Sequence, residues 1–203
     1  ASTGAVDVIP TLAGAVNTTT TITTQPATTA ATYCQNGTAT ALTVAATGSS
    51  LTYQWYKNTS ASTTGATLIA GATSSSYTPV TTSASVLYYY CVVTGTCGSV
   101  TSNFSGLVTV SGTSVGGTAT AASSSVCSGT TTTLSLTGNV GTTIQWQQSA
   151  DGVTSWTSVT GATGATATTP SISALKYFRA SVTSSPCSVS YSTVVSVSLY
   201  AAT

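Results

Sequence analysis

Short segments in which apolar and polar residues alternate recur along the chain, separated by turns rich in Gly, Ser, Thr and Asn. Residues 42–44 (Leu-Thr-Val) are one example, and residues 134–136 (Leu-Ser-Leu) are another. A strand with one face on a core has this period of two, because successive side chains point to opposite faces. About seven such segments fall in each half of the chain, which is typical of an antiparallel β-sandwich.

The order of these segments repeats once. Each copy contains a cysteine, a Gln-Trp pair, a long aromatic-rich segment and a final strand; in the first copy these are Cys34, 53–55, 88–94 and 107–110, and in the second they are Cys127, 144–146, 177–183 and 195–199. Internal repetition on this scale indicates two domains with the same fold. The predicted parts are an N-terminal arm or strand at 1–24, a domain at 25–110, a linker at 111–120 and a domain at 121–203.

Aromatic residues at equivalent places in the two copies are the expected core. Trp55 and Trp146 fall on the third strand, where a large ring fills the space between sheets about 10 Å apart. Tyr89, two residues before Cys91, is at the position of a tyrosine corner. Tyr177 is the expected core aromatic of the sixth strand in the second copy. The fold class predicted is therefore all-β, with two tandem sandwiches.

Both copies resemble the immunoglobulin (Ig)-like repeats of secreted and cell-surface proteins of the Bacteroidota. The first carries C-x-x-G, Y-Q-W-Y and Y-Y-C-V-V-T-G-T-C-G-S-V-T-S-N, and the second carries C-S-G, I-Q-W-Q-Q-S-A-D-G and Y-F-R-A-S-V-T-S. The resemblance covers about residues 30 to 200. It implies an Ig-like fold and an extracellular or cell-surface location, in proteins of adhesin, gliding-associated or stalk type.

Charge is scarce. Only 2% of the residues are charged, where about 25% is usual, and the formal net charge is +1. The charged residues are Asp7, Lys57, Asp151, Lys176 and Arg179. A net charge near zero favours association in solution. The absence of a basic patch argues against nucleic-acid binding, and no apolar run reaches the roughly 18 residues of a membrane helix.

Catalytic and metal-binding residues are equally scarce. The chain has no His, and its only acidic residues, Asp7 and Asp151, fall in different segments. Neither a catalytic triad nor a pair of carboxylates can be assembled from this set. With no His and no C-x-x-C pair, a zinc site is not expected either. We therefore predict a protein that is not an enzyme and has no cofactor.

The five cysteines indicate disulfides and an oxidising compartment, because they are spread over small β-domains. Recurrence of their positions favours the pairs Cys34–Cys97 and Cys127–Cys187, with Cys91 left as a buried thiol. Sandwich topology favours the alternative, bonds between domains or between subunits, because the partners in each symmetric pair fall at opposite poles of a domain. A disulfide needs Cα atoms within about 7 Å.

Residues 1–24 lie outside both copies and form the expected arm. Its apolar positions are compatible with a strand interrupted by Pro10; they are Val6, Val8, Ile9, Leu12 and Val16. Such an arm either forms the first strand of its own domain or adds a strand to a neighbouring molecule. No signal peptide or initiator Met precedes it, so the chain is taken as a processed, mature form.

Two functions are compatible with these features. The first is a subunit of an extracellular filament or surface fibre, which self-associates head-to-tail through its domains and the arm. The alternative is an adhesion or stalk module of a larger surface protein that binds a glycan or a cell-surface protein.

Overall fold

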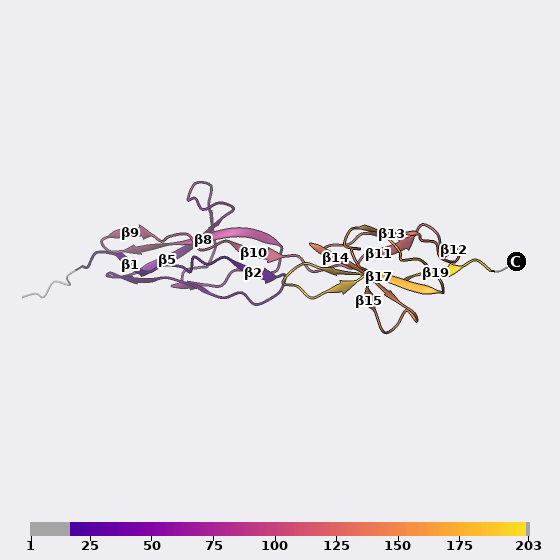
Figure 1. Cartoon of the computed structure of the whole chain (residues 1–203). Helices are drawn as coiled ribbons and strands as arrows, with labels where there is room; N and C mark the ends of the chain where they lie inside the picture. The colour runs from indigo at the N-terminus through magenta and orange to yellow at the C-terminus, as the bar shows by residue number, and fades with distance from the viewer. Residues whose placement is uncertain (1–16, 202–203) are drawn as a thin grey trace, which may run out of the picture. The chain divides into compact units, whose positions relative to one another are not determined.

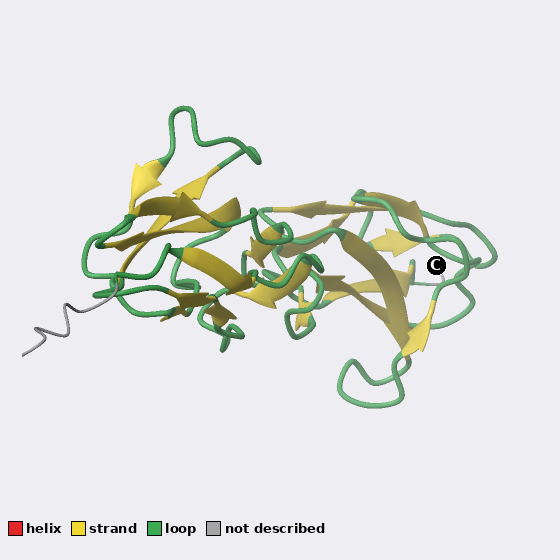
Figure 2. Ribbon diagram, turned by 90° about the vertical axis from the view of Figure 1, so that its left-hand side faces the viewer, coloured by secondary structure: helices red, strands yellow, loops and turns green. Residues whose placement is uncertain are grey.

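The computed structural model describes residues 17–201, and these residues form strands and loops without any helix (Figures 1 and 2). None of the described segments is therefore a helix that could cross a membrane. The strands are rich in Thr, Val and Tyr, whose side chains fit a pleated, half-buried surface. The predicted all-β class is confirmed.

Ten strands belong to the first repeat, and they are β1 (Thr21–Thr24), β2 (Ala31–Cys34), β3 (Leu42–Thr43), β4 (Ala45–Thr47), β5 (Thr52–Asn58), β6 (Thr67–Leu68), β7 (Ser76–Tyr77), β8 (Ser85–Gly95), β9 (Gly98–Thr101) and β10 (Val108–Ser111). Nine belong to the second repeat, and they are β11 (Thr118–Ala121), β12 (Ser125–Val126), β13 (Thr133–Thr137), β14 (Thr143–Ser149), β15 (Thr157–Ser158), β16 (Thr166–Thr168), β17 (Lys176–Thr183), β18 (Ser190–Tyr191) and β19 (Val195–Leu199).

The two repeats share one strand order. The larger sheet of the first repeat has the order β2-β10-β8-β5-β6, and that of the second has the equivalent order β12-β19-β17-β14-β15. In both repeats the first strand of this order pairs in parallel with the last strand of the repeat, while the other pairings are antiparallel. The second repeat adds a three-stranded sheet, β11-β13-β16, and the first adds the pairs β1-β4 and β3-β7.

Two compact units make up the chain, and they do not coincide with the repeats. Unit 1 holds residues 17–27 together with Leu42–Tyr77 and Tyr89–Phe104. Unit 2 holds Thr28–Ala41, Thr78–Tyr88 and residues 105–201. Unit 2 thus contains the whole second repeat and part of the first.

The core of the second repeat draws side chains from both of its sheets. Its buried members are Ala119, Val126, Leu134, Leu136, Trp146, Val159, Ala162, Ile172, Phe178, Ala180, Val182 and Val197. Trp146 has no exposed surface, and its indole N–H donates to the carbonyl oxygen of Gly164 at 3.0 Å. In the first repeat Trp55 is equally buried and donates to the carbonyl of Ser74 at 2.9 Å. Each indole therefore also fixes a loop.

The sixth strand of the expected sandwich is β8 in the first repeat and β17 in the second. In the second repeat, its buried aromatic residue differs from the expected one. Tyr89 is buried in the first repeat, with its ring centroid 5.5 Å from that of Tyr77. In β17, Tyr177 is only half-buried, and the neighbouring Phe178 is fully buried. Because side chains alternate along a strand, the core position belongs to one of these neighbours and not to both.

Two buried serines show which positions of β8 and β17 are equivalent. The hydroxyl oxygen of Ser102 accepts the N–H of Cys91 at 2.9 Å, and that of Ser192 accepts the N–H of Ala180 at 2.8 Å. Cys91 and Ala180 are therefore equivalent positions. The residues two positions before them, Tyr89 and Phe178, are therefore equivalent too. Tyr177 has the same residue type as Tyr89 but not the same position in the strand.

Candidate functional site

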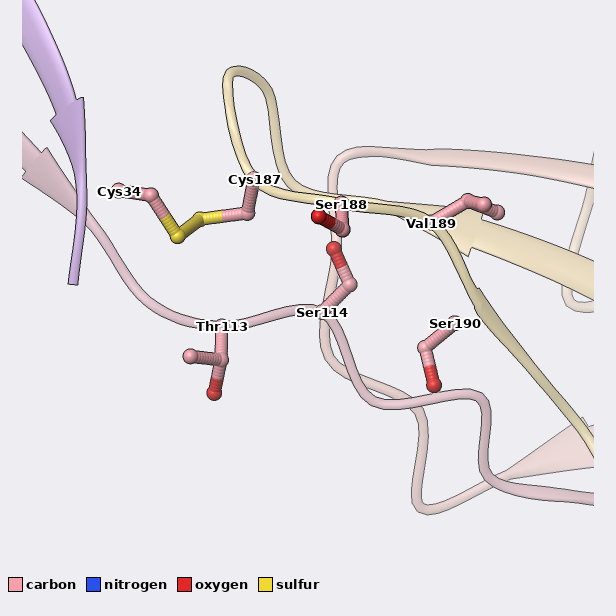
Figure 3. Close-up of a pocket in the computed structure, with 7 residues that line it drawn as sticks. All are labelled: Cys34, Thr113, Ser114, Cys187, Ser188, Val189 and Ser190. Carbon is pink, nitrogen blue, oxygen red and sulfur yellow. A yellow bond between two sulfur atoms is a disulfide. The ribbon is translucent and has the colours of Figure 1, made fainter. Parts of the chain in front are cut away.

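A disulfide joins the two repeats within unit 2. Cys34, the last residue of β2, is bonded to Cys187 in the hairpin between β17 and β18, and their Cα atoms are 4.9 Å apart (Figure 3). The symmetric pairs Cys34–Cys97 and Cys127–Cys187 are therefore wrong. Of the two schemes left open by the sequence, the bond between domains is the one formed.

Strand direction explains this result in the second repeat. Cys127 follows Val126, which pairs with Leu199 beyond the start of β17, whereas Cys187 follows the end of β17. The eight residues of β17 span about 26 Å. A bond between Cys127 and Cys187 would need Cα atoms within about 7 Å. The two cysteines are too far apart along the strand to pair.

Hydroxyl groups surround the disulfide. Ser111 Oγ donates to the carbonyl oxygen of Ser185 at 3.0 Å, and Ser114 Oγ accepts the N–H of Ser184 at 2.9 Å. These bonds connect the end of β10 and the segment after it to the hairpin that carries Cys187. The segment predicted as a linker is thus fixed by hydrogen bonds along part of its length. We call this region, residues 111–116 with the hairpin 184–190 and Cys34, the junction.

One glycine in the junction has no room for a side chain. The N–H of Gly116 donates to Ser190 Oγ at 3.1 Å. A Cβ atom at this position would overlap the carbonyl group of Tyr191. The Gly pair at 116–117, which reads as flexible linker in the sequence, is here a close approach of two backbones.

A pocket of about 300 Å³ lies beside the disulfide. Its lining, shown in Figure 3, consists of Cys34, Thr113, Ser114, Cys187, Ser188, Val189 and Ser190. No side chain of this lining is charged, so it offers hydroxyl donors and acceptors and no acid or base for catalysis. The disulfide and the hydroxyl hydrogen bonds of the junction can hold two protein surfaces together.

The other three cysteines are free thiols of two kinds. Cys91 is buried, and burial raises the pKa of its thiol to about 11. Cys97, in the turn between β8 and β9, and Cys127, just after β12, are exposed. Two of the four cysteines proposed for disulfides are therefore bonded to each other and two are accessible.

An aromatic clamp holds the arginine of the second repeat. The guanidinium carbon of Arg179 lies 4.2 Å from the ring centroid of Trp156 and 3.8 Å from that of Tyr191. Its Nε donates to Oε1 of Gln147, which lies opposite Arg179 on β14, at 2.9 Å. Sequence reasoning missed this clamp, because the pairing of Gln147 with Arg179 across strands is set by the fold.

The loop after β14 is organised by one carboxylate. Asp151 accepts hydrogen bonds from the hydroxyls of Thr154 and Ser149 and from the N–H groups of Val153 and Thr154. These donors, the Thr154 hydroxyl first, hold the pKa of Asp151 well below its usual range. These hydrogen bonds all lie within the loop, which starts at the end of β14.

Two further groups of sequence predictions can be placed. Residues 17–201 contain no cluster of three or more His, Cys, Asp or Glu side chains that could hold a metal ion. The apolar positions of the arm lie outside the described residues; they are Val6, Val8, Ile9, Leu12 and Val16. The end of the predicted arm, β1, pairs with β4 of the first repeat.

A family described as a domain of unknown function (DUF8696) matches the chain twice, at residues 22–112 and 115–201. No curated protein matches the sequence. Among solved structures, the titin I-band fragment I67–I69 is similar with 12% identity and a TM-score of 0.56, over 90% of this chain and 66% of the fragment. Titin domains A168–A170 give 13% and 0.52, over 91% and 68%.

The N-terminal four Ig domains of Dscam1 isoform 4.44 give 14% identity and a TM-score of 0.50, over 90% of this chain. The chain spans 46% of the length of that fragment. At these identities the likeness concerns the fold alone. It establishes that both sandwiches are Ig-like and arranged in tandem, as the strand order indicates.

Proposed function

The chain belongs to the DUF8696 family, of which it contains two tandem copies, and from this premise we propose that it is a non-enzymatic structural subunit of an extracellular filament or surface fibre. The subunits join head-to-tail through the Ig-like domains and the N-terminal strand. The observation that carries the proposal is the junction, in which two copies of one domain are joined through unlike surfaces. One copy contributes the end of β2 and the other contributes the β17–β18 hairpin.

A contact between unlike surfaces can repeat without limit. Each repeat has both a β2-type strand end and a hairpin, so every contact leaves one surface of each kind unused. Contacts of this heterologous type form open filaments unless the rotation closes a ring. The two-repeat chain is the smallest piece of such a series.

Surface composition supports association as well. The described residues carry four charged side chains, namely Lys57, Asp151, Lys176 and Arg179, so little electrostatic repulsion opposes contact between copies. Ser and Thr hydroxyls supply the junction with hydrogen bonds in place of ion pairs. The disulfide supports an extracellular location, since such bonds persist in oxidising compartments. The proposal also includes the assignment of both copies to the Ig-like repeats of Bacteroidota surface proteins, which the sequence motifs resemble.

The N-terminal arm supplies a second contact by adding a strand to a neighbouring subunit. Its apolar positions at Val6 and Val8 alternate as a strand requires. The arm is separable from the fold only up to a limit, because Thr20 is buried and donates to the carbonyl of Gly98 at 3.0 Å. Deletion of residues 1–16 therefore tests assembly, and a longer deletion would also disturb the first repeat.

The test compares the full chain with the variant lacking residues 1–16. Negative-stain microscopy and sedimentation should give filaments for the full chain and monomers for the variant. Circular dichroism and thermal unfolding should be the same for both. A full chain that stays monomeric at high concentration, or filaments of unchanged yield after the deletion, would contradict the proposal.

The aromatic clamp favours a second candidate, an adhesion or stalk module that binds a glycan or a cell-surface protein. Tyr191 is 46% exposed, and Trp156 and Arg179 are half-buried beside it. Exposed aromatic rings next to an amide and a guanidinium provide stacking and hydrogen bonds together. A glycan array that gives a specific ligand, lost in Trp156→Ala and kept in Tyr56→Ala of the first repeat, would support this function.

A further inference from the structure

The hairpin cysteines of the two repeats are equivalent. Ser102 and Ser192, the buried serines that accept an N–H from the sixth strand, mark the same point in each repeat. Cys97 and Cys187 both lie five residues before that serine. Each therefore occupies the hairpin that follows the sixth strand.

The two cysteines at strand ends, Cys34 and Cys127, are equivalent as well. Asn36 and Gly129 each lie two residues after a cysteine, with left-handed φ angles of 63° and 81°. The N–H of each donates to a carbonyl oxygen at 2.8 Å, in the segment before the sixth strand of its own repeat. Cys34 and Cys127 thus share one local structure at the end of β2 and β12.

The disulfide uses one cysteine of each class. It joins the strand-end cysteine of the first repeat, Cys34, to the hairpin cysteine of the second, Cys187. What is left is the complementary pair, the hairpin cysteine Cys97 and the strand-end cysteine Cys127. Both are exposed free thiols.

We propose that Cys127 of one chain forms a disulfide with Cys97 of a second copy, so that the bond between repeats inside the chain recurs between chains. This inference rests on the proposed filament and names its covalent link. A second copy is the partner because its Cys97 lies in the hairpin equivalent to the one that Cys34 already binds within the chain. The bond joins unlike positions, so each added chain again leaves one Cys97 and one Cys127 at the ends.

The reaction is a two-electron oxidation. The thiolate of Cys127 attacks a low-molecular-weight disulfide such as oxidised glutathione, and one glutathione thiol leaves. The thiolate of Cys97 from the next chain then attacks the mixed disulfide, and the second glutathione thiol leaves. One S–S bond forms, one is broken, and the two protons lost by the cysteines are taken up by the two glutathione thiolates.

The experiment incubates the full chain with oxidised glutathione and separates the products without reductant. A ladder of multimers is expected, with a Cys97–Cys127 peptide found by mass spectrometry. Mixing ¹⁴N-labelled and ¹⁵N-labelled chains should give that peptide in mixed-isotope form. A bond found only between peptides of the same isotope would show that it forms within one chain and would overturn the inference.

Three variants sharpen the test. Cys97→Ser and Cys127→Ser should each remain monomeric alone, and a mixture of the two should give dimers and nothing larger. Cys91→Ala is the matched control, because the equivalent residue of the second repeat is already Ala180, and it should keep the full ladder. Dimers formed by either serine variant alone would mean that like cysteines pair, which would also overturn the inference.

Microscopy separates this inference from the proposed function. Filaments of the wild-type chain that form with oxidised glutathione but give no ladder of multimers would overturn the covalent link and leave the filament function intact. A ladder without filaments would contradict the function and leave the link intact. A wild-type chain that forms neither filaments nor a ladder would contradict both the filament function and the covalent link.

Discussion

At the scale of single residues, the five cysteines occupy three kinds of surroundings. Cys34 and Cys187 are bonded, Cys97 and Cys127 are exposed, and Cys91 is buried. Only the exposed pair is accessible to a reagent in solution. Reactivity should therefore divide the cysteines as burial does, because the thiolate is the nucleophile.

Thiol labelling checks this division. The folded monomer, prepared without oxidant, should react with a thiol reagent at two cysteines at pH 8, and the unfolded, unreduced chain at three. Cys91 stays protected because burial raises its pKa to about 11. This neutral thiol favours the folded state below the ordinary pKa near 9, and that contribution is lost as the pH rises towards 11. Three fast-reacting thiols in the folded protein would contradict the prediction.

Ser102 and Ser192 are buried, with 5% and 7% of their surface exposed. The hydroxyl oxygen of each accepts one backbone N–H, from β8 and β17 respectively. Ser192→Ala should lower the free energy of unfolding by about 1–3 kcal/mol, because the N–H of Ala180 loses its acceptor in a buried place. Urea unfolding measures the change. Ser173→Ala, at an exposed position, is the control and should stay within about 0.5 kcal/mol of the wild type.

At the scale of elements, the loop between β14 and β15 is a turn fixed by a carboxylate. Asp151 gathers four donors from three residues around it. A group whose pKa is lowered by folding stabilises the folded state above its unfolded pKa, here near 3.8, and this contribution is lost as the pH falls further. The loop should therefore keep its form down to pH 4 and weaken below it.

Carboxyl NMR titration tests the loop. The midpoint of Asp151 should lie well below its ordinary value near 3.8, and Thr154→Val should raise it, because the Thr154 hydroxyl is the largest cause of the shift. The exposed Thr160→Val is the control and should leave the midpoint unchanged. An unshifted Asp151 in the wild type would show that the loop is not organised in this way.

The elements also show what a sequence can and cannot predict. Alternation and repetition were enough for the all-β class, because a half-buried strand imposes a period of two. Tyr177 was misplaced because residue type was followed instead of register, which the bond to Ser192 sets. The disulfide was chosen wrongly because recurrence of the cysteine positions predicts a pair within each repeat, whereas strand direction puts the two cysteines of one repeat at opposite ends of it. The clamp on Arg179 depends on contacts across strands that a linear sequence does not display.

At the scale of the whole molecule, the near absence of charge shapes how copies meet. Salt screens interactions between exposed charges, with a Debye length of about 10 Å at 0.1 M. A chain with 2% charged residues and a net charge of +1 has few such interactions to screen. If the filament forms as proposed, its yield should change little between 20 mM and 500 mM sodium chloride.

Sedimentation at the two salt concentrations gives the answer. Sulfate at equal ionic strength is the useful comparison, because it strengthens apolar and polar burial and should raise the yield. A filament that dissolves in sodium chloride would indicate ion pairs in the contact, which the scarcity of charged side chains argues against.

The bond between Cys34 and Cys187 also has a mechanical meaning. The cysteines are 153 residues apart in sequence, so a pulling force applied outside them cannot extend the chain between them while the S–S bond is intact. Strands β1, β2, β18 and β19 lie on the terminal sides of the cysteines and carry the load through their pairing in the sheets. Reduction would release the enclosed residues and add about 50 nm of extensible chain. The length of chain held between the two cysteines therefore becomes available only after the disulfide is reduced.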